Sequence, residues 1–425
     1  MPGAILIKRI NPQHRDQNLD ELEELAKSAG YEVLDKITQV RPLPDKAYCI
    51  GRGKAEEVSE LLAAERPDKV IFDEKLNAVQ AYNLSKLFQV EVIDRFNLIL
   101  EIFAQRARTK EARLQVELAN LIYERPRARM KVTLARRGEQ PGFKGLGQYQ
   151  ADIYESEITG RIAKIKEELA VIRKRQDQTR LRRKERGFDM VALAGYTNAG
   201  KSTLMNALVG ETVVAKDQLF TTLVPTTRMM EAGRRRVLLT DTVGFIKDLP
   251  HFMVEAFRST LEEIYLADLI ILVVDASEPP EVVLEKLATC HDTLWGKIGP
   301  IPVITALNKI DKIDLPTLER TEAAIKNLAP HPVAVSARTG DGLEELRATV
   351  EFFLPKWVSA ELTLPHTEEG LSTLSQLYDE AIVRDVQYGT GPKGPCIRVS
   401  VDARESVLSR LAERTQDWMQ KGACQ

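Results

Sequence analysis

The spacing of hydrophobic and polar residues changes several times along this chain. Residues 1–105 alternate short apolar runs, such as AILIKRI and KVIFDE, with amphipathic stretches, such as NLDELEELAKSAG and KAEEVSELLAA. Short β-branched runs predict strands, and amphipathic stretches between them predict helices that cover a sheet. We therefore expect a small N-terminal α/β domain over residues 1–105.

Residues 106–187 have the period of helices instead. Apolar side chains recur there at alternating spacings of four and three, which is the pattern of a coiled-coil seam. They are Ile158, Ile162, Ile165, Leu169 and Ile172 in the later part, and Leu114, Leu118 and Leu121 in the earlier part. Because the Gly-rich run RRGEQPGFKGLGQ separates the two parts, we expect an antiparallel helical hairpin with a flexible tip.

After residue 187 the chain has near-continuous apolar runs. MVALAG, RVLLTD, LIILVVDA and IPVITALNK are separated by segments of helical length. This pattern predicts a mostly parallel sheet, covered by helices on both faces, over residues 188–355. Residues 356–425 offer a strand in AELTLP, a helix, two strands around GTGPKGP and a terminal helix. We expect a small α+β C-terminal domain there.

The composition is that of an ordinary soluble globular protein. The chain has 425 residues, of which 44% are hydrophobic and 29% are charged. No apolar run is long enough to span a bilayer, and MPGAILIKRI becomes charged too early for a signal peptide, so we expect a cytoplasmic protein. The cysteines have no paired spacing that predicts a zinc site or a redox motif. They are Cys49, Cys290, Cys396 and Cys424.

A phosphate-binding motif, GYTNAGKS, follows the predicted strand MVALA and precedes a predicted helix. This is the G-x-x-x-x-G-K-[ST] pattern in the context that it requires. We expect its amides to bind phosphates, Lys201 to neutralise the β- and γ-phosphates, and the Ser202 hydroxyl to bind Mg²⁺. The residues of this predicted site are Gly195, Tyr196, Thr197, Asn198, Ala199, Gly200, Lys201, Ser202 and Thr203.

A second motif, DTVG, ends the predicted strand RVLLT. We expect Asp241 to hold Mg²⁺ directly or through water, and the Gly244 amide to meet the γ-phosphate, with Thr242 and Val243 between them. The next residue is Phe245, where many such enzymes have a Gln that orients the attacking water. A phenyl ring cannot form the hydrogen bond that orients this water. We therefore expect slow nucleotide hydrolysis in the absence of an activating partner, and we assign no catalytic residue.

Between these motifs lies the Thr-rich segment DQLFTTLVPTT, which has no clear periodicity. We expect a loop that orders over the γ-phosphate, with the Thr222 hydroxyl on Mg²⁺. Thr221 is the alternative Mg²⁺ ligand. A third possibility is that the Thr hydroxyls bind no metal and only hydrogen-bond to the neighbouring backbone. The predicted nucleotide-binding residues of the loop are Phe220, Thr221, Thr222, Leu223 and Val224.

The bound base is indicated by ALNKID. The Asp311 carboxylate can accept two hydrogen bonds from the N1 and N2 donors of guanine, and adenine lacks that pair, so the motif favours GTP over ATP. In PVAVSARTGDG a further backbone segment can donate to the guanine carbonyl. The predicted base-binding residues are Asn308, Lys309, Ile310 and Asp311, followed by Ser336, Ala337 and Arg338.

These motifs resemble those of the TRAFAC translational GTPases, and within them the HflX family of the Obg-HflX group. The segments VIDRFNLILEIFAQRARTKEARLQVELANL, residues 92–121, and YCIGRGKAEEV, residues 48–58, look like that family's linker and N-terminal signatures. The resemblance covers most of residues 1–355. It implies a protein that binds GTP, hydrolyses it slowly and associates with the large ribosomal subunit, and some members split stalled or idle ribosomes. It also implies Thr222 as the magnesium-binding Thr.

Other features of the chain bear on this resemblance. The tip sequence GEQPGFKGLGQYQAD lacks the longer loop with an Arg-Gly-Pro-Gly-Glu-Thr run of bacterial relatives, and is more similar to archaeal members. The C-terminal domain carries no clear signature. Related GTPases with Asn at the place of Asn198 can use it to hold K⁺, and the alternative is that Asn198 only fits the loop backbone.

Basic residues cluster in the predicted hairpin. VIRKRQDQTRLRRKERG, residues 171–187, has eight basic and two acidic residues, and the tip offers Phe143 and Tyr149 for stacking. Two basic arms favour binding to RNA phosphates over a merely solvated helix face. The residues predicted to bind RNA are Arg125, Arg127, Arg129, Arg136, Arg137, Lys144, Arg173, Lys174, Arg175, Arg182 and Arg183.

Other functional classes stay open on sequence alone. A metabolic P-loop kinase would not need NKID, and a tRNA-modifying GTPase is expected to carry a separate one-carbon chemistry domain. The main alternative is a nucleotide-driven RNA remodeller or ribosome-assembly factor, if GRGK, residues 51–54, binds a second nucleotide and is not merely a strand-to-helix turn. We expect a monomer whose partners are the large ribosomal subunit and its rRNA.

Overall fold

The computed structural model forms two compact units. The first comprises Met1–Val171, Lys216–Val224 and Asp248–Ser259, and the second comprises Ile172–Ala215, Pro225–Lys247 and Thr260–Gln425. The structure describes residues 1–12, 18–137, 146–185, 188–210, 225–232, 235–246, 253, 258–391 and 394–414. Among these, the backbone alone is described for residues 127–137, 146–154, 180–185, 235, 258–260, 406, 410 and 412–414.

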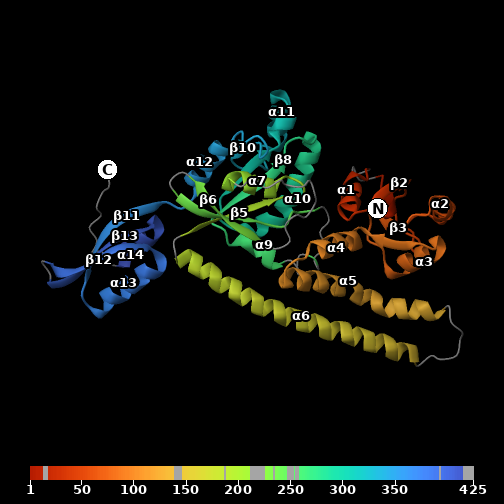
Figure 1. Ribbon diagram of the computed structural model, residues 1–425, viewed down its shortest axis with the longest axis horizontal. Helices are drawn as coiled ribbons and strands as arrows, with labels where there is room; N and C mark the ends of the chain where they lie inside the picture. The colour runs from red at the N-terminus through yellow and green to blue at the C-terminus, as the bar shows by residue number, and fades with distance from the viewer. Residues whose placement is uncertain are drawn as a thin grey trace. The chain divides into compact units, whose positions relative to one another are not determined.

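The N-terminal part is a parallel four-stranded sheet with helices, as its alternating pattern predicts (Figure 1). The strand order is β2-β1-β3-β4, and the central strand β1 is buried along most of its length. Helices α2 and α3 share a core with β1, and α1 contacts α4. The elements are β1 (Gly3–Ile10), α1 (Asp20–Ser28), β2 (Glu32–Val40), α2 (Arg52–Glu65), β3 (Lys69–Phe72), α3 (Ala78–Phe88), β4 (Glu91–Asp94) and α4 (Arg95–Arg106).

The VIDR sequence forms a buried junction between β4 and α4. The Asp94 carboxylate caps α4 by accepting a hydrogen bond from the amide of Asn97, and it accepts another from the hydroxyl of Tyr123 on the following helix. Arg95 is buried and lies 2.9 Å from Asp73 and 2.8 Å from Glu21. A buried charge is tolerated when it is paired. This part of the family signature therefore has a structural role.

Helices α5 (Lys110–Arg137) and α6 (Leu146–Glu185) form the expected hairpin. Leu114, Leu118, Ile158, Ile162 and Ile165 of the predicted seam are buried, whereas its remaining members are partly exposed. Lys110 pairs with Glu168, and Glu117 pairs with Arg161. Because residues further along α5 meet residues earlier in α6, the helices are antiparallel.

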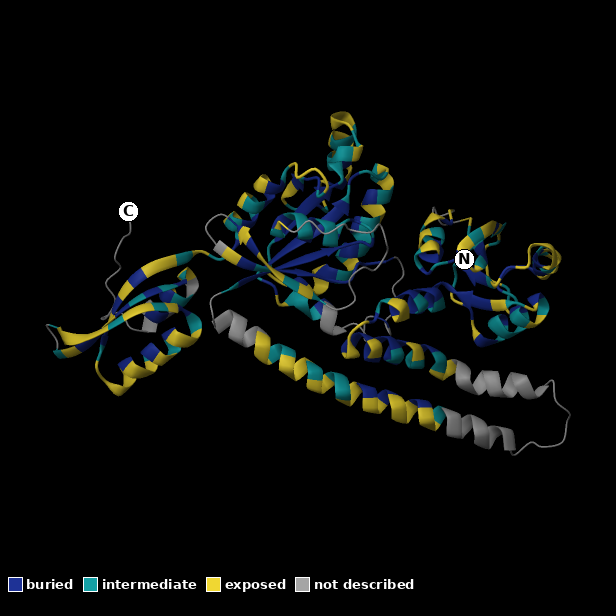
Figure 2. Cartoon of the chain, viewed as in Figure 1, coloured by how far each residue is buried: buried dark blue, intermediate teal, exposed yellow. Residues whose placement is uncertain are grey.

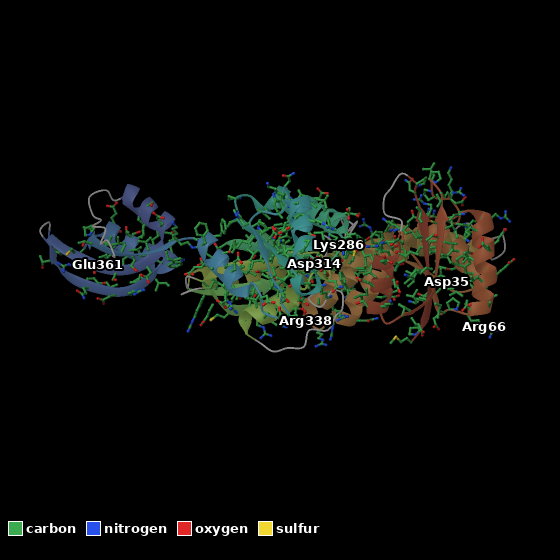
Figure 3. The ribbon with its side chains drawn as sticks, turned by 90° about the horizontal axis from the view of Figure 1, so that it is seen from above. Asp35, Arg66, Lys286, Asp314, Arg338 and Glu361 are labelled. Carbon is green, nitrogen blue, oxygen red and sulfur yellow. The ribbon has the colours of Figure 1, made fainter. Side chains whose placement is uncertain are left out.

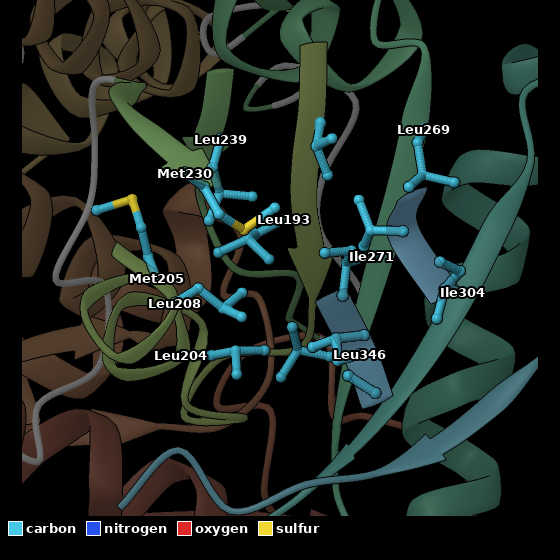
Figure 4. Close-up of a cluster of buried hydrophobic side chains, with 14 of the residues drawn as sticks. Leu193, Leu204, Met205, Leu208, Met230, Leu239, Leu269, Ile271, Ile304 and Leu346 are labelled. Carbon is cyan, nitrogen blue, oxygen red and sulfur yellow. The ribbon is translucent and has the colours of Figure 1, made fainter. Parts of the chain in front are cut away.

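The nucleotide-binding sequence motifs belong to a six-stranded sheet with the order β10-β9-β8-β5-β7-β6. All neighbours in it are parallel except β6, which pairs antiparallel with β7. Side chains of this core, such as Leu193, Met230 and Ile271, are shown in Figure 4. The elements are β5 (Asp189–Gly195), α7 (Lys201–Val209), β6 (Thr226–Ala232), β7 (Arg235–Asp241), α9 (Arg258–Tyr265), β8 (Leu269–Asp275), α10 (Pro280–Ile298), β9 (Val303–Asn308), α11 (Leu315–Ile325), β10 (Pro332–Ala334) and α12 (Leu343–Phe353).

The C-terminal part is a three-stranded antiparallel sheet with the order β11-β13-β12. Buried and exposed residues alternate along β11 and β13, because α13 and the described part of α14 pack on one face only (Figure 2). The elements are β11 (Trp357–Pro365), α13 (Glu368–Glu380), β12 (Ile382–Gly391), β13 (Gly394–Arg404) and α14 (Glu405–Arg414). The fold class predicted from the sequence is thus confirmed.

A membrane-spanning helix is not found within the described part of the chain: no helix there is both long and apolar enough.

Candidate nucleotide-binding site

The predicted motifs meet at one edge of the six-stranded sheet. Gly195, Asp241, Asp275 and Asn308 each end a strand, and β5, β7, β8 and β9 are parallel neighbours. In such sheets the carboxyl ends of the strands form the place where ligands bind. Motifs that are up to 113 residues apart in the sequence therefore share one site.

The phosphate loop runs from β5 into α7, which begins at Lys201. Gly200 has φ +89°, and a Cβ there would lie 2.3 Å from the amide nitrogen of Asn308. Only glycine allows this close approach of the loop to the base motif. Asn308 in turn donates from Nδ2 to the carbonyl of Ala199, at 2.9 Å. The phosphate and base motifs are therefore fixed to one another.

Lys201 is buried, with 7% of its surface exposed, and its Nζ lies 2.7 Å from the carbonyl oxygen of Tyr196 and 3.1 Å from that of Gly195. Burial lowers the pKa of the Lys201 ammonium to about 8, and the nearby Asp241 carboxylate opposes this shift. A negatively charged phosphate at this position would raise the pKa of Lys201 again.

Ser202 and Asp241 lie side by side. The Ser202 hydroxyl donates to the Asp241 carboxylate at 2.6 Å, and the Thr242 hydroxyl donates to the Leu193 carbonyl at 2.7 Å. A Cβ at Gly244 would lie 2.8 Å from Lys201 Nζ. The residue types and their proximity suit a phosphate-bound Mg²⁺, because that ion prefers oxygen ligands.

Phe245 is joined to the phosphate loop by a two-bond backbone bridge. Its amide donates to the Gly195 carbonyl at 3.0 Å, and its carbonyl accepts from the Thr197 amide at 2.8 Å. The Phe245 side chain is buried, with 2% of the residue exposed. The ring at the place of the usual water-orienting Gln is therefore part of the packed interior.

Lys309 bridges the base motif and the phosphate loop. It adopts φ +68°, and its Nζ donates to the carbonyl of Asn198 at 2.8 Å and to the carboxylate of Asp275 at 2.5 Å. The sequence reasoning missed Asp275. Asp275 lies near the end of the apolar run LIILVVDA. A polar residue at the end of a predicted strand is the signal that would have indicated it, because Asp241 and Asn308 were predicted from the same position on their strands.

The two carboxylate oxygens of Asp311 have different contacts. Its Oδ1 accepts a hydrogen bond from the Ser336 hydroxyl at 2.7 Å, and its Oδ2 lies 2.8 Å from Nη2 of Arg338. The Ala337 amide donates to Asn308 Oδ1 at 3.0 Å, and the Ser336 amide donates to the Asp341 carbonyl at 2.9 Å. The Ser336–Arg338 segment is therefore tied to the base motif through Asn308.

Several predicted site residues lie outside what the structure describes. The five loop residues 220–224, among them the expected magnesium ligand Thr222, belong to this group, as does Lys144 of the hairpin tip. For Arg127, Arg129, Arg136, Arg137, Arg182 and Arg183 the backbone is helical and the side chains are not described.

The described basic residues of the hairpin differ in their surroundings. Arg125, Lys174 and Arg175 are exposed. Arg173 instead makes an ion pair of 2.5 Å with Glu262 on α9. One member of the predicted RNA-binding set is thus engaged within the protein. The GRGK sequence forms the start of α2, with Gly51 as its N-cap residue.

Comparison with known proteins covers nearly the whole length of the chain. Family models described as "GTP-binding GTPase N-terminal", "GTP-binding GTPase Middle Region" and "50S ribosome-binding GTPase" match residues 16–104, 106–183 and 190–309. The structure titled as a GTP-binding protein from the hyperthermophilic archaeon Sulfolobus solfataricus in complex with GDP is 28% identical, with a TM-score of 0.45. It covers 83% of this chain and 98% of that chain.

The parallel sheet, the phosphate loop and the NKID motif define a P-loop GTPase, an enzyme that hydrolyses GTP to GDP and phosphate. "GTPase HflX" of Thermococcus kodakarensis is 46% identical over 87% of this chain and 86% of its own length. "GTPase HflX" of Thermofilum pendens is 41% identical over 97% of this chain and 96% of its own length. The chain therefore belongs to the HflX family of GTPases, as its motifs indicated, and archaeal relatives are among those it matches.

Proposed function

We propose that this GTPase binds the large ribosomal subunit, and that its nucleotide state controls ribosome splitting, rescue or a related stress response. The observation that carries the proposal is the exposed basic surface of α6 at Lys174 and Arg175. This helix ends at Glu185, four residues before β5 of the GTPase sheet begins. Arginine and lysine clusters neutralise RNA phosphates. The description "50S ribosome-binding GTPase" of the model that matches residues 190–309 supports the same partner.

Within the site we propose roles for the chain's own residues. Lys201 binds the β- and γ-phosphates, the amides of residues 195–200 orient them, and Asp311 selects guanine. Ser202 and Asp241 hold Mg²⁺ together with Thr222, and the ion supplies charge neutralisation on the phosphates when it is bound. The 2.6 Å contact between Ser202 and Asp241 supports this pairing.

We further propose that hydrolysis is slow until a partner or a cation completes the site. The buried ring of Phe245 offers no hydrogen bond to water, which supports a long-lived GTP state. Asn198, in the phosphate loop, is the proposed ligand for K⁺. GTP turnover of the free protein is expected to be faster in KCl than in NaCl at equal ionic strength, and equal rates would exclude this role for Asn198.

The functional units that we propose are residues 1–105, 106–187, 188–355 and 356–425. We propose that the protein acts as a monomer, and that it acts in the cytoplasm because the large ribosomal subunit is found there. Their sheets are separate, and the hairpin has its own apolar seam.

Ribosome binding is tested by cosedimentation with purified large subunits in the presence of a non-hydrolysable GTP analogue. Reversal of two exposed charges, Lys174→Glu with Arg175→Glu, is expected to weaken the association while GDP affinity stays unchanged. The matched control, Lys164→Glu with Lys166→Glu, reverses two charges on the same helix outside the basic run. Equal sedimentation of the test variant and the wild type would contradict RNA binding by this part of α6.

A further inference from the structure

An arginine side chain, that of Arg338, lies against Asp311, the carboxylate to which we assign guanine recognition. The side chain of Asp311 is 8% exposed, and its Oδ2 has no hydrogen-bond donor in correct alignment among the described residues. The guanidinium of Arg338 lies 2.8 Å from this oxygen, at ion-pair distance, although 73% of the Arg338 side chain is exposed. Arg338 is labelled in Figure 3. The exposed charge of Arg338 therefore lies beside an oxygen that still lacks an aligned donor.

The physical chemistry of Asp311 requires such a partner. A buried carboxylate oxygen without a donor or a positive charge is costly, because it has lost its hydration. Its other oxygen is occupied by the Ser336 hydroxyl at 2.7 Å. Guanine can supply adjacent N–H donors from N1 and N2, and a guanidinium presents a similar pair of N–H groups in a plane. The base and Arg338 thus offer Asp311 the same chemistry.

We propose that Arg338 is a specificity-determining residue that covers Oδ2 of Asp311 in the nucleotide-free protein and is displaced by guanine. This inference rests on the proposed role of Asp311 in guanine recognition. Since base and side chain compete for one oxygen, Arg338 lowers the affinity for guanine nucleotides and favours release of GDP. A base with fewer N–H donors than guanine leaves Oδ2 of Asp311 paired with Arg338, so it does not compete with Arg338 for this oxygen.

The test compares GDP with inosine diphosphate, whose base lacks the exocyclic amine, by calorimetry on the full chain. Arg338→Ala is expected to bind GDP about threefold to tenfold more tightly than the wild type, in the range of a partly exposed ion pair. Its affinity for inosine diphosphate is expected to be unchanged or lower, so that the preference for GDP increases. Arg338→Lys is expected to behave like the wild type, because an ammonium can also reach Asp311.

The control variant is Arg320→Ala, which removes an arginine of α11 in the same domain and is expected to leave both affinities unchanged. Weaker or equal GDP binding by Arg338→Ala would overturn the inference, and so would an equal gain for both nucleotides. Asp311→Asn separates the proposed role of Asp311 in guanine recognition from the proposed role of Arg338. If this variant retains the wild-type preference for GDP, the assignment of Asp311 itself fails, whereas a lost preference with an unaltered Arg338→Ala refutes only the role of Arg338.

Discussion

The titration of Lys201 is determined by its burial under the phosphate loop. Its pKa is lowered from 10.5 to about 8, so the free protein loses this proton as the pH rises through 8. A bound phosphate favours the ammonium, and the affinity for GDP is therefore expected to fall as the pH is raised above 8. In the unfolded chain the proton stays until about pH 10.5, so this group makes stability rise with pH between 8 and 10.5.

Calorimetry in two buffers of different ionisation enthalpy measures the protons taken up on GDP binding. Uptake is expected to be near zero at about pH 7 and to approach half a proton or more at about pH 8.5. Absence of proton uptake at the higher pH would show that Lys201 is already charged in the free site.

Phe245 is held by packing and by its backbone bridge to Gly195 and Thr197. Phe245→Gln is expected to lower the free energy of unfolding by about 2–4 kcal/mol, because a polar amide replaces a buried ring. It is not expected to accelerate GTP turnover, since the side chain points into the interior. Single-turnover hydrolysis and denaturant titration check both statements, and a rate above that of the wild type would refute the second.

At the scale of elements, α6 is connected to α9 through Arg173 and Glu262. An RNA phosphate that engaged Arg173 would have to compete with this carboxylate. Glu262→Gln is therefore expected to raise the affinity for a ribosomal RNA fragment by about twofold to threefold at low salt, and the gain should shrink as salt is added.

Glu281→Gln on α10 is the matched control for that measurement, because it removes one negative charge from an exposed position of the same domain. Filter binding or fluorescence anisotropy gives the affinities. Identical gains in both variants would indicate a general charge effect and would argue against competition at Arg173.

The arrangement of α5 and α6 also shows what element patterns predict. Spacings of four and three predicted the buried side chains of Leu114, Leu118, Ile158, Ile162 and Ile165, because neighbours on a helix surface are set by its period. The other three members of the predicted seam are only partly buried. The pattern could not predict that Tyr123 of α5 reaches Asp94 at the start of α4. That contact depends on how α5 packs beside another element.

At the scale of the molecule, Arg404 links the C-terminal sheet to the GTPase sheet. It lies at the end of β13 and pairs with Asp268 at 2.9 Å and with Asp189 at 3.0 Å, at the edge of the sheet opposite the nucleotide motifs. These two carboxylates raise the pKa of Arg404 despite its burial. Removal of the arginine from this partly buried cluster takes away the positive charge that offsets two carboxylates.

Arg404→Met is expected to destabilise this unit by about 2–4 kcal/mol, measured by denaturant unfolding. Arg398→Met is the control, because it lies on the same face of β13 and is exposed. If both variants were equally stable, the Arg404 cluster would not contribute to the attachment of the C-terminal part.

The sequence by itself determined the fold class and most of the GTPase motifs. Apolar periodicity reports which faces are buried, and glycine-rich or carboxylate-bearing strand ends report phosphate and base chemistry over a few consecutive residues. The tertiary structure alone decided which side chains meet over long separations: Arg173 with Glu262 across 89 residues, and Arg404 with Asp189 across 215. The pairing of Arg338 with Asp311 has the same origin. These contacts depend on the packing of separate elements, which local periodicity does not encode.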